Sequence, residues 1–230
     1  NLKIVVRAGA GYDNIDLDAA SKKNICVMNT PGQNANAVAE LALGLMVYAV
    51  RNFYNGNPGT ELLGKKIGIH AFGNVGKNVA RIAKGFGMEV YAYDPFCDKN
   101  IIEKEDIIPV CDVEELYSTC HVISLHIPAT KETIESIDFN LLSKMPQGAI
   151  LINTARKEVI HESDMEKIMK KRSDFKYITD ILPKNHDAML KYADRYYCTP
   201  KKMGAQTAEA NINAGIAAAK QIINFFKNGD

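Results

Sequence analysis

A glycine-rich segment between a hydrophobic run and an amphipathic stretch is the strongest chemical signal in the sequence. Residues 66–71 read as a β-strand that leads into Ala71-Phe72-Gly73-Asn74-Val75-Gly76, and helical periodicity follows at once. This order matches a dinucleotide-binding fingerprint whose first glycine is replaced by alanine. Gly73 would let a pyrophosphate approach the backbone, Gly76 would let the helix pack closely on the strand, and the helix N-terminus would attract the phosphate charge.

An acidic residue after the next strand indicates which dinucleotide binds. Residues 89–93 read as a strand, and Asp94 follows it in the run Asp94-Pro95-Phe96-Cys97. A carboxylate at this place accepts hydrogen bonds from the adenosine ribose, and no lysine or arginine stands beside it to bind a 2′-phosphate. The sequence therefore predicts NAD rather than NADP. The alternative is a turn whose glycines serve packing alone, but the strand, helix, second strand and aspartate together favour the cofactor.

Composition excludes several other classes of function. The chain has 230 residues and a formal net charge of +1, which favours neither nucleic acid nor a membrane surface as a partner. No apolar run approaches the ~18 residues that span a bilayer. Cysteines and histidines show no metal-ligand spacing, so we expect no metal and a reduced, cytoplasmic protein. The chain begins with Asn1 rather than methionine, and we expect preceding residues.

Strand-like and helix-like segments alternate along most of the chain. The predicted strands are residues 2–6, 25–28, 66–71, 89–93, 122–126, 149–153, 177–181 and 196–198. The predicted helices are residues 34–54, 75–86, 113–118, 140–145, 163–171 and 208–228. This alternation predicts the α/β class, a doubly wound parallel sheet forming a Rossmann-type NAD-binding domain.

Further segments of the chain have the residues, order and spacing of one enzyme family. Besides the nucleotide loop, these segments are Arg7-Ala8-Gly9-Ala10-Gly11-Tyr12-Asp13-Asn14-Ile15-Asp16, Val27-Met28-Asn29-Thr30-Pro31-Gly32-Gln33-Asn34, His126-Ile127-Pro128, Asn153-Thr154-Ala155-Arg156 and Thr199-Pro200. Through them the chain resembles the D-isomer-specific 2-hydroxyacid dehydrogenases, and most closely the phosphoglycerate dehydrogenases among them.

The resemblance implies a domain organisation. Members of the family have two α/β domains with the active site in the cleft between them. We expect residues 1–32 to be a remnant of a truncated substrate-binding domain and residues 33–200 to form the NAD-binding domain. Residues 201–230 would be a return segment with a C-terminal helix. The apolar segment 34–54 would lie between the domains and form a homodimer contact.

The resemblance also implies roles for individual residues. Arg156 would bind the substrate's carboxylate and carbonyl beside the nicotinamide, because a guanidinium is always charged and makes two parallel bonds. Asp180 matches the aspartate that binds the nicotinamide carboxamide. The predicted cofactor-binding residues are Ala10, Gly73, Asn74, Val75, Gly76, Asp94, Ile127, Thr154, Ala155, Arg156, Asp180, Lys202 and Gly204. The predicted substrate-binding residues are Arg7, Gly9, Ala10, Gly11 and Asn34. For Arg7, a solvent contact at a strand end is the alternative.

The sequence departs from the family at the proton-transfer residues. A histidine usually follows the Thr-Pro step and pairs with a glutamate, but here Thr199-Pro200 is followed by Lys201 and Lys202, and residues 183–185 contain no acid. A lysine can serve as a general acid or base. We therefore expect Arg156, Lys202 and Asp180 to form the catalytic set. The alternative is two solvated lysines in an inactive or repurposed protein.

Three hypotheses for function follow. The first is an NAD-dependent oxidoreductase that converts the small molecule 3-phosphoglycerate to 3-phosphohydroxypyruvate for serine biosynthesis. The second is the same chemistry on another D-2-hydroxy acid. The third is a non-catalytic NAD-binding regulatory or interaction protein of the same fold.

Overall fold

The computed structural model describes residues 1–12 and 14–229, in two compact units. One unit contains Asn1–Val38 and Ala205–Asp230, and the other contains Ala39–Gly204. Asp13, which belongs to one of the matching segments, lies outside the described residues. No described helix is long and apolar enough to cross a membrane.

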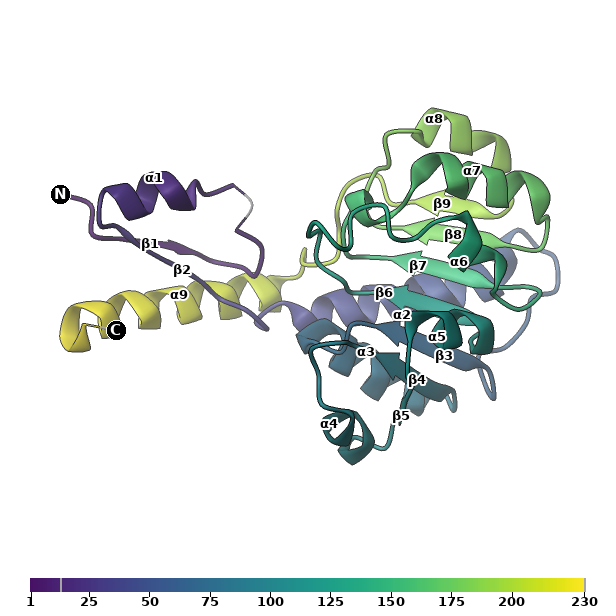
Figure 1. The fold of residues 1–230 in the computed structure, drawn as a ribbon, viewed down its shortest axis with the longest axis horizontal. Helices are drawn as coiled ribbons and strands as arrows, with labels where there is room; N and C mark the ends of the chain where they lie inside the picture. The colour runs from purple at the N-terminus through teal and green to yellow at the C-terminus, as the bar shows by residue number, and fades with distance from the viewer. Residues whose placement is uncertain (13, 230) are drawn as a thin grey trace. The chain divides into compact units, whose positions relative to one another are not determined.

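The larger unit is built on one parallel sheet of seven strands (Figure 1). The strands are β3 (Lys66–His70), β4 (Glu89–Tyr93), β5 (Ile108–Pro109), β6 (Val122–Leu125), β7 (Ile150–Asn153), β8 (Lys176–Thr179) and β9 (Tyr196–Cys198). Their order is β5-β4-β3-β6-β7-β8-β9, so the chain runs outward from β3 and then returns to its other side. This topology confirms the predicted doubly wound class, and it places the switch point between β3 and β6, where open α/β sheets bind their ligands.

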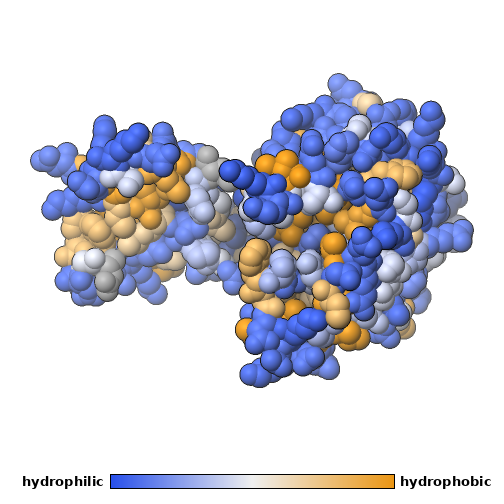
Figure 2. All heavy atoms as spheres, in the orientation of Figure 1, coloured by the Kyte–Doolittle hydropathy of each residue, from blue (hydrophilic) through white to orange (hydrophobic). Residues whose placement is uncertain are grey.

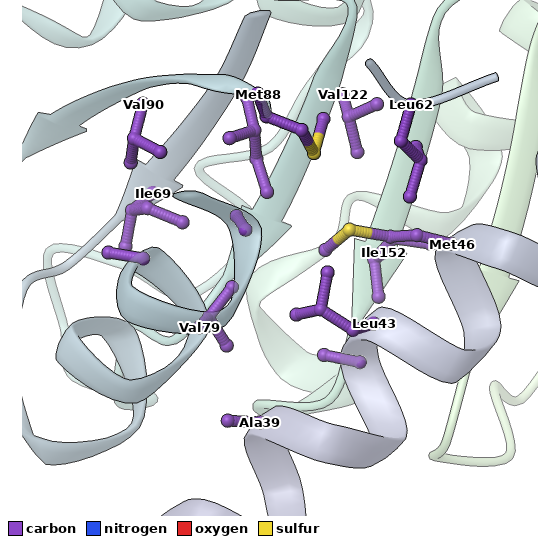
Figure 3. Packing of buried hydrophobic residues seen from close by; sticks show 14 of the residues in the cluster. Ala39, Leu43, Met46, Leu62, Ile69, Val79, Met88, Val90, Val122 and Ile152 are labelled. Carbon is purple, nitrogen blue, oxygen red and sulfur yellow. The ribbon is translucent and has the colours of Figure 1, made fainter. Parts of the chain in front are cut away.

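Successive side chains of each strand point to opposite faces of this sheet, and they are mostly apolar on both faces. Helices therefore cover both faces. The helices of this unit are α3 (Asn74–Gly85), α4 (Lys99–Lys104), α5 (Val113–Thr119), α6 (Phe139–Ser143), α7 (Glu162–Lys171) and α8 (His186–Met189). Short 3-10 turns lie at Asn52–Tyr54, Lys157–Val159 and Leu190–Tyr192. One core joins the sheet to α3 and to helix α2 (Ala35–Val50); Figure 3 shows Leu43 and Met46 of α2 with Val79 of α3 there. The second core joins the opposite face to α5, α6 and α7.

The smaller unit contains two parallel strands and two helices. They are β1 (Ile4–Arg7), α1 (Leu17–Lys22), β2 (Cys26–Asn29) and α9 (Ala208–Asn228). The Nε2 of Gln221 in α9 donates a 2.9 Å hydrogen bond to the backbone oxygen of Asn29. On the other side of α9, Ile212, Ile216 and Phe226 are exposed, and Figure 2 shows further hydrophobic surface on this unit.

The predicted helix over residues 34–54 is too long. Helix α2 ends at Val50, and Asn52, Phe53 and Tyr54 take φ angles of 51°, 54° and 54°. The Nζ of Lys176 donates to the backbone oxygen of Ala49 at 2.7 Å and to the Oδ1 of Asn52 at 2.6 Å. This distant lysine, which the local pattern does not reveal, therefore caps the helix and supports a left-handed turn that costs about 1–2 kcal/mol per residue.

Candidate active site

The nucleotide turn after β3 places an alanine in a conformation that favours glycine. Ala71 has a φ of 80°, and its backbone N–H donates to the oxygen of Tyr93 at 2.9 Å. Only glycine adopts this region without steric cost. The departure noted in the sequence therefore strains the backbone but does not abolish the turn.

The two glycines of the turn serve different needs. A Cβ at Gly73 would meet no atom within 4 Å, whereas a Cβ at Gly76 would lie 2.3 Å from the oxygen of Ala71. Gly76 is thus required for the close packing of α3 on the turn. Gly73 is exposed and leaves open space in front of the backbone, as a pyrophosphate needs.

Asp94 joins the nucleotide turn to the loop after β4. Its Oδ2 accepts a 2.8 Å hydrogen bond from the N–H of Phe72, and its Oδ1 accepts one of 2.9 Å from the N–H of Phe96. The carboxylate is half-buried, while Phe96 is 96% exposed. The structure therefore places Asp94 beside the turn, as the sequence predicted.

Two observations fit a bound dinucleotide at this edge of the sheet. The N-cap of α3, Gly73, provides no side-chain hydrogen bond to the first turn, so the first N–H groups of the helix face outward without a side-chain cap. The buried Oγ1 of Thr154, after β7, has no hydrogen-bond partner among the described residues. Gly73, Asn74, Val75 and Gly76 would hold the pyrophosphate, and Ile127, Thr154 and Ala155, which follow β6 and β7, would line the neighbouring part of the site.

Arg156 lies on a turn that a buried asparagine fixes. The Oδ1 of Asn153 accepts from the N–H of Ala155 at 3.0 Å, and its Nδ2 donates to the backbone oxygen of Arg156 at 3.0 Å. The Nη1 of Arg156 donates to the oxygen of Ala155 at 2.8 Å, and the side chain is half-buried. Asn153 stands in the sequence as part of the Asn153-Thr154-Ala155-Arg156 motif, which does not by itself reveal this contact.

Asp180 is buried directly after β8 and binds the loop that carries the two lysines. Its Oδ1 accepts hydrogen bonds from the hydroxyl of Thr199 at 2.8 Å and the N–H of Met203 at 2.7 Å. Its Oδ2 accepts one of 2.8 Å from the N–H of Gly204. Lys201 and Lys202 are exposed on this loop.

The position where the family carries its glutamate contains a different contact. Residues 183–185 hold no acid, but the Oε1 of Glu162 in α7 accepts from the N–H of Lys184 at 2.8 Å. The Nδ2 of Asn185 donates to the backbone oxygen of Glu162 at 3.1 Å. Glu162 thus fixes the backbone of this loop, a role that the linear sequence did not indicate.

Two histidines at the carboxyl ends of β3 and β6 are held neutral. Burial lowers the pKa of His70 to about 4, and its Nδ1 lies 3.2 Å from the hydroxyl of Tyr117. Burial, with a smaller contribution from His70, lowers the pKa of His126 to about 3. Neither histidine is therefore charged near neutral pH. Neither can act as a protonated histidine in place of the one that the family carries after the Thr-Pro step.

The predicted substrate-binding residues lie in the smaller unit. Gly9 is buried with a φ of 148°, and the guanidinium of Arg7 packs over it and hydrogen-bonds to the oxygen of Ala8. The N–H of Gly9 donates to the Oγ1 of Thr30 at 2.7 Å, and the Nδ2 of Asn29 donates to the oxygen of Ala10 at 2.7 Å.

Asn29 at the end of β2 and Thr30 directly after it therefore fix the backbone of Gly9 and Ala10. Asn34, half-buried, accepts at its backbone oxygen from the N–H of Val38 at the start of α2. Among the described residues, no group of three or more histidines, cysteines and acids is placed to hold a metal ion.

Comparisons with known proteins agree with this geometry. A family model described as the NAD-binding domain of D-isomer specific 2-hydroxyacid dehydrogenases matches residues 34–201. The hydroxypyruvate reductase of Thermotoga maritima is 37% identical over 96% of this chain and 77% of that protein. The D-3-phosphoglycerate dehydrogenase of Archaeoglobus fulgidus is 35% identical over 99% of this chain but 46% of that protein.

Solved structures give the same result. The NAD⁺-bound 3-phosphoglycerate dehydrogenase of Entamoeba histolytica matches with a TM-score of 0.92 and 48% identity, over 99% of this chain and 73% of that one. The chain spans less than half the length of the curated phosphoglycerate dehydrogenases of Archaeoglobus fulgidus and Methanocaldococcus jannaschii that it matches. The predicted fold class, the NAD cofactor and the oxidoreductase family are confirmed, and the chain belongs to the D-isomer specific 2-hydroxyacid dehydrogenases.

Proposed function

We propose that this protein oxidises a D-2-hydroxy acid with NAD, and that its substrate is 3-phosphoglycerate, converted to 3-phosphohydroxypyruvate for serine biosynthesis. The observation that carries this proposal is a backbone hydrogen bond between the segment that carries Arg156 and the segment that binds the loop of Lys202. The N–H of Asp180 donates to the oxygen of Asn153 at 2.9 Å, so the turn of Arg156 and the strand end that binds the Lys202 loop are neighbours.

The residues divide the chemistry between them. Arg156 binds the substrate's carboxylate and carbonyl oxygen through paired, charge-assisted hydrogen bonds. The Nζ of Lys202 accepts the proton of the C2 hydroxyl, and NAD, when bound, supplies the acceptor for the C2 hydride. The resemblance to the family supports a further role in substrate binding for Arg7, Gly9, Ala10, Gly11 and Asn34, which all belong to the smaller unit. The phosphoglycerate dehydrogenases among its relatives support this choice of substrate.

A second substrate is favoured by one specific comparison. The Thermotoga maritima relative, which matches this chain over most of its own length, is a hydroxypyruvate reductase. Reduction of hydroxypyruvate needs the same arginine and the same proton donor but no phosphate contact. Turnover of the full natural protein with 3-phosphoglycerate, D-glycerate and D-lactate would separate the two. A higher kcat/KM for D-glycerate would refute the phosphorylated substrate, and no turnover with any of the three would favour a non-catalytic NAD-binding protein.

The proposal also covers the oligomeric state of the protein and its location in the cell. We infer a homodimer formed through the segment 34–54, in which Tyr54 is 66% exposed. The alternative is an ordinary core helix, and Leu43 and Met46 of α2 do pack in the core of this chain. A monomer in sedimentation at micromolar concentration would contradict it. A cytoplasmic location, and the division into residues 1–32, 33–200 and 201–230, stay predictions. Unpaired cysteines among the described residues support a reducing compartment.

A further inference from the structure

We propose that a cavity in the larger unit binds a small zwitterion, namely an aliphatic α-amino acid with a free ammonium and a free carboxylate group. The cavity has a volume of about 320 Å³ and is lined by residues that follow β6, β7 and β8, among them the first residues of α7. Cavities of this size are at the lower end of the range that holds small molecules in proteins, ~300–1,000 Å³.

Backbone hydrogen bonds fix the wall of the cavity. The N–H of Glu135 donates to the oxygen of Glu158 at 2.8 Å, the N–H of Ile137 donates to the oxygen of Val159 at 3.0 Å, and the N–H of His161 donates to the oxygen of Ile137 at 3.1 Å. These three bonds join the segments after β6 and β7 as a short parallel ladder. The cavity is therefore formed before any ligand binds, as ligand sites usually are.

The residues that line the cavity carry charges of both signs. They include three glutamates and two lysines, which are Glu135, Glu158, Glu162, Lys157 and Lys184. No ion pair among the described residues involves any of these five side chains. A ligand with a single charge would be repelled by part of this lining, whereas a ligand with one charge of each sign finds a complementary partner for both.

The positive end of the ligand is an organic ammonium rather than a metal ion. Although three glutamates line one cavity, no group of three or more histidines, cysteines and acids within the described part of the chain is placed to hold a metal ion. An ammonium group carries three N–H donors on a flexible molecule and can reach acceptors that do not converge on one point. Glu135 and Glu158 are the exposed acceptors for it.

The negative end of the ligand is favoured at the start of α7. The N-cap of this ten-residue helix, His161, provides no side-chain hydrogen bond to the first turn, and Ser163 of that turn and Lys184 both line the cavity. A helix N-terminus and a lysine ammonium both stabilise a carboxylate. Ile134, which is 50% exposed, provides the apolar contact for an aliphatic side chain.

The cavity borders the turn that carries Arg156. Arg156 is the N-cap of the 3-10 turn Lys157–Val159, and Lys157 and Glu158 of that turn line the cavity. A bound amino acid therefore contacts the segment that positions this arginine. The effect of the ligand on turnover rests on the proposed function, whereas its binding does not.

Calorimetric titration of the full natural protein tests the chemistry of the ligand. We expect glycine and L-valine to bind, and N-acetyl-L-valine and L-valinamide, which lack the ammonium and the carboxylate charge respectively, to bind about 10-fold more weakly or worse than L-valine. Equal binding of L-valine and its two derivatives would overturn the proposal. So would a lack of binding by both free amino acids at millimolar concentration.

Variants of the exposed lining residues test the place of binding. Glu158→Gln and Lys184→Met should each weaken L-valine binding about 10-fold. Both side chains are exposed, so we expect both variants to fold. Glu132→Gln is the matched control, because Glu132 is exposed on the loop after β6 but does not line the cavity. Unchanged binding in both cavity variants would refute the site.

Two further measurements separate this cavity from the proposed substrate site, whose arginine also binds carboxylates. Arg156→Gln should bind L-valine as the wild type does, and loss of binding in this variant alone would overturn the proposal. In hydrogen exchange, L-valine should protect the amides of Glu135 and Ile137 but not that of Gly148, which donates to Asp174 away from the cavity. Protection that spares both cavity amides would count equally against it. A protein that turns over no 2-hydroxy acid but binds L-valine in this way would refute the proposed function and leave the cavity site standing.

Discussion

The backbone N–H of Phe72 donates a 2.8 Å hydrogen bond to the carboxylate of Asp94. This bond joins the nucleotide turn to the end of β4, where we propose that the adenosine ribose binds. In that proposal the carboxylate has two tasks, which are to hold the turn and to present negative charge where a 2′-phosphate would lie.

We predict that the protein binds NADH in clear preference to NADPH and that Asp94→Ala reduces this preference. NADH affinity should fall by about 10- to 100-fold, the range for hydrogen bonds to a charged group. Fluorescence titration measures both cofactors. Asp98→Asn is the matched control, because Asp98 is the N-cap of α4 and asparagine caps a helix equally well. Equal affinity of the wild type for NADH and NADPH would contradict the role of Asp94.

The strained alanine of the turn gives a prediction about stability. Ala71→Gly should stabilise the fold by about 1 kcal/mol, because glycine adopts the φ of 80° without a steric penalty. Gly76→Ala should destabilise it, since its Cβ would lie 2.3 Å from the Ala71 oxygen. Urea unfolding measures both. Gly85→Ala in the same helix, whose Cβ would meet nothing within 4 Å, is the control. Destabilisation by Ala71→Gly would show that the turn is not strained.

The sequence predicts the sheet better than the contacts that hold the site. Strands such as Glu89–Tyr93 and Tyr196–Cys198 are found at their predicted bounds because continuous apolar runs between turn residues define buried strands. The sequence pattern predicts neither the two-residue strand β5 nor helices α1, α4 and α8, which have four to six residues each. The hydrogen bonds of Glu162 and Asp180 join elements that are about twenty residues apart in the sequence, and no local pattern encodes them.

The buried histidine of β3 predicts loss of stability in acid. His70 has a pKa of about 4 in the folded protein, whereas an unfolded histidine has about 6.5. Between these values only the unfolded chain takes up the proton, so stability falls as the pH drops from 6.5 to 4, by on the order of 3 kcal/mol for this residue. Urea unfolding at several pH values should show a smaller decline in His70→Phe. An equally steep decline would assign the acid sensitivity to other groups.

We predict that Arg7 binds the phosphate group of the substrate. If the substrate carries a phosphate, Arg7→Ala should raise KM by the equivalent of about 2–3 kcal/mol, the loss of a charge-assisted contact. NADH affinity should not change, because the cofactor loop lies in the other unit. Steady-state kinetics give KM for 3-phosphoglycerate and for D-glycerate, and only the KM for the phosphorylated substrate should rise. An unaltered KM would mean another phosphate contact or another substrate.

Lys202 should be the group that accepts the hydroxyl proton. The histidine that performs this task in the family is absent, and Arg156 cannot do so because a guanidinium stays protonated throughout the accessible pH range. Asp180 is buried and bound to three donors. A lysine base must first lose its own proton, and a free lysine has a pKa near ~10.4, so the oxidative rate should climb through alkaline pH with no break near ~6.5. Lys202→Ala should lower kcat by on the order of 10²–10⁴-fold.

Lys201 is the neighbour of Lys202 on the same exposed loop, so Lys201→Ala is the matched control, and it should lower kcat much less. If Lys202→Ala kept full activity while Lys201→Ala lost it, the assignment between the two lysines would be reversed. If both variants stayed active, proton transfer by a lysine would be wrong altogether.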